Sequence, residues 1–174
     1  MVKLGRFGWG QSREFTARSD RGLYGDLPAG SDIAGAADKI GRQRLAEQLS
    51  GTTDRKSRKY RNARDYISRH VRGARRTVKS EFEGKVAGLL RNDRRAEIRQ
   101  RGSMRVEIRA DVQVSKKVWK GLMRKDLTGS QVNDYLDALE RDDGNEAMSV
   151  FLDAYGIGRD VSEVKTVRDV SYTW

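Results

Sequence analysis

Cysteine is absent from this chain of 174 residues, and histidine and proline occur once each, as His70 and Pro28. The lack of cysteine excludes disulfide bonds, zinc sites with cysteine ligands and thiol catalysis. A single histidine excludes metal sites built on a pair of histidines and disfavours most hydrolytic triads. A packing role or a phosphate contact suits His70 better than catalysis. We therefore predict a protein that is not an enzyme and needs no cofactor.

Long apolar segments are also absent. No window approaches the run of about 18 apolar residues that a transmembrane helix needs. The basic start of the sequence is not followed by the apolar segment of a secretory signal. A reducing compartment suits a chain without cysteine. We expect a cytoplasmic protein without a membrane partner.

Positive charge is abundant and unevenly distributed. Residues 1–103 hold 25 Lys and Arg against 12 Asp and Glu (25 − 12 = +13), whereas residues 104–174 hold 11 against 13 (11 − 13 = −2). This asymmetry indicates a basic module that faces nucleic acid, joined to a near-neutral module. We predict an α+β fold in three parts. These are an extended basic arm rich in glycine and aromatic residues (1–35), a helical DNA-binding domain (36–102) and an α+β dimerisation domain (103–174).

The densest cluster of cations runs from Arg55 to Arg76, where ten Lys and Arg accompany one acid, Asp65. A cation held near a phosphate backbone displaces a condensed counterion, so the cluster is typical of a nucleic-acid contact. Ten neighbouring cations also repel one another unless a polyanion relieves them. The alternative is a solvated positive face, because arginine-rich surfaces are common.

The pattern of apolar residues predicts four helical segments in this part of the chain. They cover residues 36–49, 53–58, 61–72 and 78–100, with a turn over 59–62 between the second and the third. The arginines of the last helix are expected to point outward: Arg91, Arg94, Arg95, Arg99 and Arg101.

The helix over 61–72 has the form expected of a recognition helix. Tyr60, Ala63, Ile67 and Val71 share one apolar face, and arginine and serine lie opposite. We expect this helix to enter the major groove of duplex DNA. The candidates for base contacts are Arg61, Arg64, Ser68 and Arg69. The candidates for contacts with the phosphate backbone are Lys56, Arg58, Lys59, Arg75 and Arg76. Arg72, on the same side as Arg61, is a further candidate for a DNA contact.

The second half of the chain has a different pattern. Strict alternation predicts a strand over 105–114, and alternation returns in a closing strand over 164–174. Between them we predict a short helical turn over 116–122 and helices over 130–140 and 146–155. The two strands are expected to pair, and because two strands make a marginal sheet, we expect a homodimer through this half.

Acidic residues gather near the end of the helix over 130–140. Asp137, Glu140, Asp142, Asp143 and Glu146 could in principle hold Mg²⁺ as carboxylates do in nucleases. A solvated helix end followed by a turn explains the run better. We therefore predict no metal site.

The segment Leu45-Ala-Glu-Gln-Leu-Ser-Gly-Thr, followed by a turn and by Arg61–Arg72, resembles the helix-turn-helix region of telomere terminal proteins and related plasmid-borne proteins of actinobacterial linear replicons. The order of elements in the second half is similar too, and the resemblance covers residues 40–174. It implies a DNA-binding protein of a plasmid, phage or linear replicon, active in replication, end maintenance or transcription control. In terminal proteins a hydroxyl residue becomes covalently attached to the DNA 5′ end. The candidates here are Thr77, Ser80, Ser103 and Ser115, and none lies in a recognisable motif.

Two alternatives stay open. The arginine-rich helix and the glycine- and aromatic-rich arm could fold against structured RNA, as part of a ribonucleoprotein. The chain could also be a structural assembly protein of a phage or plasmid system. Binding to an RNA hairpin as tight as to duplex DNA would favour the first of these alternatives.

Overall fold

The computed structural model describes residues 9–75 and 77–174. The chain forms two compact units, and the α+β prediction is confirmed. One unit, here the helical unit, contains Asp26–Arg94, and the other, the sheet unit, joins the described residues before Asp26 to Arg95–Trp174. The boundaries differ from the predicted ones because the first helix and the residues from Arg95 onward belong to the sheet unit.

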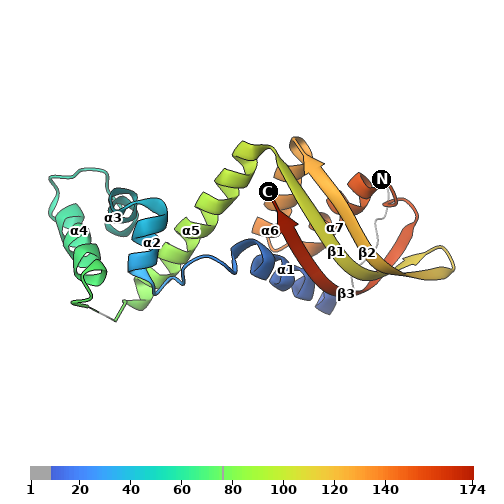
Figure 1. Ribbon diagram of the computed structural model, residues 1–174, viewed down its shortest axis with the longest axis horizontal. Coiled ribbons are helices and arrows are strands. Elements are labelled where there is room, and N and C mark those ends of the chain that lie inside the picture. Colours follow the sequence, from blue (N-terminus) through green and yellow to red (C-terminus); the bar gives the residue numbers. More distant parts are fainter. Residues whose placement is uncertain (1–8, 76) are drawn as a thin grey trace. The chain divides into compact units, whose positions relative to one another are not determined.

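The helical unit holds α2 (Ile33–Ile40), α3 (Arg42–Ser50), α4 (Arg58–Val71) and the first part of α5 (Ser80–Arg101). In Figure 1, α2, α3 and α4 are the blue to green helices that lie together. Their apolar faces form one core. Its most deeply buried members are Ile33, Ala36, Leu45, Ala46, Ile67, Val86 and Leu90.

Two predicted helices of this unit are corrected. The helix expected over 36–49 is interrupted at Gly41, whose φ of 87° is left-handed and lets α2 turn into α3. The helix expected over 53–58 is a loop. Thr52 and Asp54 hold that loop through side-chain acceptors, since the backbone N–H of Asp54 donates to Thr52 Oγ1 and that of Lys56 to Asp54 Oδ1. Such local bonds compete with a helix.

The sheet unit is built on three antiparallel strands in the order β2-β1-β3. They are β1 (Ser103–Val114), β2 (Lys117–Thr128) and β3 (Val161–Thr173). The predicted pairing of the first and last strands is therefore correct, but β2 replaces the helical turn expected over 116–122. The sequence Lys-Lys-Val-Trp-Lys-Gly shows no clean alternation because this end of β2 is exposed on both faces.

Every third residue of β3 is buried, which is not the spacing of a regular strand. Val161, Val164, Val167 and Val170 all face the core. The register with β1 shifts at three places along this pair of strands. Each irregularity returns a valine to the buried face, so β3 contributes to the core despite a period of three.

Three helices cover one face of the sheet: α1 (Trp9–Tyr24), α6 (Ser130–Glu140) and α7 (Gly144–Tyr155) (Figure 1). The opposite face carries charges that pair across the strands. Arg105 pairs with Asp126 at 2.8 Å, and Arg124 pairs with Glu107 at 3.1 Å. One solvated face and one covered face are typical of an antiparallel sheet.

The prediction of an extended arm over 1–35 is wrong for Trp9–Tyr24, which is helix α1. Phe15, Ser19 and Leu23 follow at a spacing of four and are fully buried. A serine in the middle of this stripe weakens the helical pattern. A Cβ on Gly22 would lie 2.9 Å from the Tyr172 ring, so a small residue is needed where α1 crosses β3.

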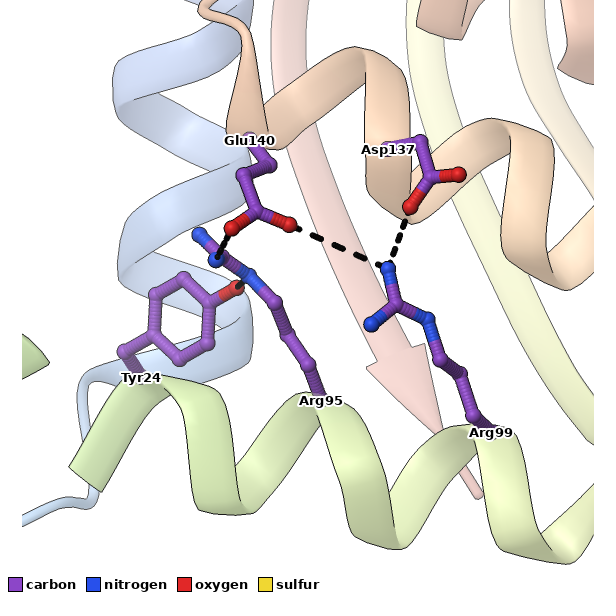
Figure 2. Close-up of polar contacts among 5 residues, drawn as sticks. All are labelled: Tyr24, Arg95, Arg99, Asp137 and Glu140. Carbon is purple, nitrogen blue, oxygen red and sulfur yellow. Dashed lines mark hydrogen bonds and ion pairs between the residues drawn. The ribbon is translucent and has the colours of Figure 1, made fainter. Parts of the chain in front are cut away.

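Two of the arginines expected to point outward from α5 are buried in ion pairs. Arg94 is 5% exposed and bonds to Asp26 at 2.7 Å within the helical unit. Arg95 is 9% exposed; it donates to the Tyr24 hydroxyl at 2.7 Å and pairs with Glu140 at 3.0 Å, while Arg99 pairs with Asp137 (Figure 2). The prediction is wrong for these residues because carboxylates distant in sequence meet them.

No helix in the described parts of the chain has both the length and the apolar character to span a membrane.

Candidate nucleic-acid interface

Helix α4 begins at a serine cap. The Ser57 side chain accepts a hydrogen bond from the backbone N–H of Tyr60 at 3.1 Å, and satisfies one of the free donors at the helix start. The buried face of α4 then attaches the helix to its unit. Five of its residues are buried: Tyr60, Ala63, Tyr66, Ile67 and His70. This agrees with the predicted apolar face and adds Tyr66 and His70 to it.

The outward face of α4 is basic and solvent-accessible. Arg61, Arg64 and Arg72 are exposed on it, and Ser68 between them is half-buried. Arg64 lies 3.6 Å from Asp65, but both side chains are more than 60% exposed, so this pair is worth little. In the described chain, Arg61 and Arg72 form no ion pair with a carboxylate.

The other predicted contacts lie around this outward face. Lys56 is exposed in the loop before α4, and Arg58 is exposed at the first residue of the helix. Arg69 is exposed in the last turn. Arg76 lies outside the described residues. The structure thus brings most of the predicted cations to one helix and its preceding loop.

Lys59 belongs to a different side of α4. It lines a cavity of about 430 Å³ together with Asn62, Tyr66, Arg75 and Lys79. Arg75 is half-buried, with its guanidinium carbon 4.9 Å from the centre of the Tyr66 ring. Sequence reasoning did not single out Lys79 or Asn62, because no spacing rule links α4 to the segment that follows it.

His70 lies on the buried face of α4. Burial lowers its pKa below the ordinary value, and the nearby charge of Arg75 lowers it further. Its ring packs against Tyr66 with centroids 4.6 Å apart. This supports the packing role predicted for His70, and the neutral form is the one that the folded unit favours.

The arginines of α4 and of α5 differ in their electrostatic surroundings. Those that α5 buries are neutralised by Asp26 and Glu140. No carboxylate fulfils this role for Arg61 or Arg72 among residues 9–75 and 77–174. An exposed cation without a partner can exchange its hydration for a phosphate at little cost.

The acidic run near α6 does not converge on a common point. Asp137 and Glu140 pair with arginines of α5, and Asp143 caps α7 by accepting from the backbone N–H of Glu146 at 2.9 Å. Glu146 pairs with Arg141. Within the described ranges, no group of three or more potential ligands could hold a metal ion.

The comparisons with known proteins give no match. No family model, curated protein or solved structure matches this chain. The resemblance to terminal proteins therefore stays a prediction. Of the hydroxyl candidates, Thr77, Ser80, Ser103 and Ser115 are all exposed, and exposure does not distinguish among them.

Proposed function

We propose that this protein binds duplex DNA through helix α4. The observation that carries the proposal is the outward face of α4, where Arg61, Arg64 and Arg72 are exposed. Among residues 9–75 and 77–174, no acid neutralises them beyond the weak pair of Arg64 with Asp65. A helix held by one buried face, with a basic face toward solvent, has the shape and charge that fit the major groove. Lys56 in the preceding loop and Arg58 at the start of the helix add contacts with the phosphate backbone of the DNA.

The position of each side chain suggests its part in binding. Arg61, Arg64 and Ser68 recur at the helical period along the exposed side of α4, which suits them to base edges. Lys56 in the loop before α4, Arg58 at its first residue and Arg69 in its last turn lie toward the ends of the helix, which suits them to phosphates. For Arg69 this replaces the base contact predicted from the sequence. On this proposal Lys59 and Arg75 have a lesser part, because they line the cavity on another side of α4.

A matched pair of variants tests the proposal. The triple substitution Arg61→Ala, Arg64→Ala and Arg72→Ala removes three charges from the outward face. The control removes three exposed arginines elsewhere: Arg21→Ala, Arg42→Ala and Arg159→Ala. Both variants carry the same net charge, so non-specific attraction to the polyanion falls equally in the two.

We expect the first variant to bind a duplex about 100-fold more weakly than the native chain at low salt, and the control to differ by only about threefold. Fluorescence anisotropy with a labelled duplex measures both. Equal losses in the two variants would contradict a site on α4. Tighter binding to an RNA hairpin than to the duplex would contradict DNA as the partner.

A further inference from the structure

Val118 and Trp119 are the exposed large apolar side chains in the described part of the chain, at 43% and 40% exposure. They lie next to each other in β2, at the end of the sheet where the hairpin turns. An exposed tryptophan is uncommon, because its large ring is usually buried or engaged by a partner. The surroundings of Trp119 therefore bear on what it contacts.

The hairpin gives Trp119 a defined direction. β1 and β2 are joined by the turn at Ser115 and Lys116, since Val114 pairs with Lys117, and Trp119 lies opposite Val112. Val112 is fully buried, and directly opposed residues point to the same face of a sheet. Trp119 thus faces the side that the helices cover, whereas Val118 points to the open face.

Trp119 helps to line a cavity of about 380 Å³ at this end of the sheet unit. The other walls are Val114 and Lys117 of the hairpin, Tyr155 at the end of α7, and Ile157 just after it. The lining is mainly apolar, and two of its members are aromatic. A cavity of this size is at the lower end of those that hold small ligands, and suits a single ring system.

Gly121 fixes where the indole lies. A Cβ at this position would lie 2.5 to 3.2 Å from three atoms of the Trp119 ring. The ring therefore covers the backbone of Gly121, two residues along the same face of β2. Any larger residue at position 121 would displace the ring from its place beside the cavity.

Lys117 lines this aromatic cavity, and Lys116 precedes it in the turn. Lys120 lies opposite Asp111 and therefore points, like Val118, to the open face of the sheet. Lys116, Lys117 and Lys120 are exposed within a span of five residues, and they form no ion pair with a described carboxylate. Asp111, the residue opposite Lys120 in the ladder, is bonded to Arg168 at 2.9 Å. The ligand that fits such a site has a flat aromatic group and adjacent negative charge.

We propose that this cavity, the hairpin cavity, binds an unpaired base of single-stranded nucleic acid. The base stacks on Trp119, and Lys117 together with its neighbour Lys116 contacts the flanking phosphates. Stacking on aromatic side chains along a basic surface is the general mode by which proteins hold single strands. The proposal concerns the sheet unit and goes beyond duplex binding by α4, so either can fail without the other.

Other occupants fit the site less well. In a symmetric dimer the same patch meets itself, which would bring two copies of Lys116 and Lys117 together. An anionic membrane surface favours apolar side chains that project outward, whereas the Trp119 ring is laid across Gly121 beside a hollow. Both alternatives become outcomes of the test.

The test uses the full chain with Trp9→Phe and Trp174→Phe, so that Trp119 is the only tryptophan. Titration with an oligothymidylate of about 12 nucleotides should quench its fluorescence, since bases stack on the indole. The triple α4 variant, carried in the same background, should keep this quenching while it loses duplex affinity. Quenching of the Trp119 fluorescence by anionic vesicles but not by the oligonucleotide would overturn the proposal. A fluorescence change that follows protein concentration and not oligonucleotide concentration would indicate self-association, and would also overturn it.

Affinity variants in the native background complete the test. Trp119→Leu should weaken oligothymidylate binding about 10-fold or more, whereas Val118→Ala, the adjacent exposed residue on the other face, should change it less than about twofold. Gly121→Ala, which keeps the tryptophan but displaces it, should weaken binding as well. Urea unfolding verifies that each variant is folded. Folded Trp119→Leu protein with native affinity, or equal losses in Trp119→Leu and Val118→Ala, would overturn the proposal.

Discussion

Individual arginines of this chain have two different roles, and burial separates them. Arg94 and Arg95 are almost fully buried and bonded to carboxylates, so their charges are neutralised within the fold. Arg61 and Arg72 are exposed on α4 without such partners in the described chain. Composition counts all of these as basic residues. Of these four arginines, only Arg61 and Arg72 have a charge that is available to a polyanion.

Arg95 should matter for stability far more than Arg99, four residues later. Arg95→Ala removes a buried guanidinium that donates to the Tyr24 hydroxyl and pairs with Glu140, and should lower the free energy of unfolding by about 2–4 kcal/mol. The side chain of Arg99 is 35% exposed, and Arg99→Ala should cost less than about 1 kcal/mol. Urea denaturation measures both. Equal losses would show that the Arg95 cluster is not structural.

His70 should make the helical unit sensitive to acid. Burial lowers the pKa of His70 in the folded state below its unfolded value near 6.5, so folding favours the neutral ring. The stabilisation is complete above about pH 6.5 and is lost as the pH falls through the folded pKa. Thermal unfolding between about pH 7.5 and 5 should show this decline.

The control for this prediction is His70→Phe, which keeps an aromatic ring beside Tyr66 but cannot titrate. Its stability should change less over the same pH range than that of the native chain. Identical pH dependence in the two proteins would assign the decline to other groups.

Helix α4 depends on its first turn. Ser57→Ala removes the acceptor for the Tyr60 N–H and should destabilise the helical unit by about 1 kcal/mol. Ser57→Asn, another good capping residue without charge, should restore most of the loss. Chemical denaturation followed by circular dichroism measures both. If Ser57→Ala left the free energy of unfolding unchanged, the cap would not contribute to stability.

Elements with a strong period could be predicted from the sequence, and those whose burial depends on distant partners could not. The buried face of α4 and strand β1 show a regular apolar spacing, which is visible locally. The buried face of α1 instead includes Ser19 and depends on Gly22 for its approach to Tyr172. Strand β2 is exposed at its start, so alternation is lost there. Neither the buried face of α1 nor the start of β2 therefore shows a regular apolar spacing in the sequence.

The residues of the candidate site also divide into those that the sequence pattern predicts and those that only tertiary packing brings together. The outward cations of α4 were predicted from the helical repeat, because Arg61, Arg64, Ser68 and Arg72 recur at its period. The cavity beside Arg75 and Lys79 was not predicted, since tertiary packing creates it. The hairpin cavity also escaped prediction. It forms only because β2 pairs with β1 and places Trp119 near Tyr155.

At the scale of the whole molecule, the two units have separate cores and different surfaces. The helical unit carries the outward basic face of α4, and the sheet unit carries ion pairs across its open face and the hairpin cavity. The homodimer through residues 103–174 stays a prediction. Sedimentation equilibrium should give twice the monomer mass of 19.7 kDa, and a purely monomeric protein at high concentration would contradict it.

The dependence of duplex affinity on salt tests the central claim most directly. Binding to a random-sequence duplex should weaken steeply between about 50 and 300 mM salt, with a log–log slope that corresponds to roughly six or more phosphates. In the triple variant Arg61→Ala, Arg64→Ala and Arg72→Ala, we expect that number to fall by about three. No duplex binding at the low-salt end, or an unchanged slope in the variant, would contradict DNA binding through α4.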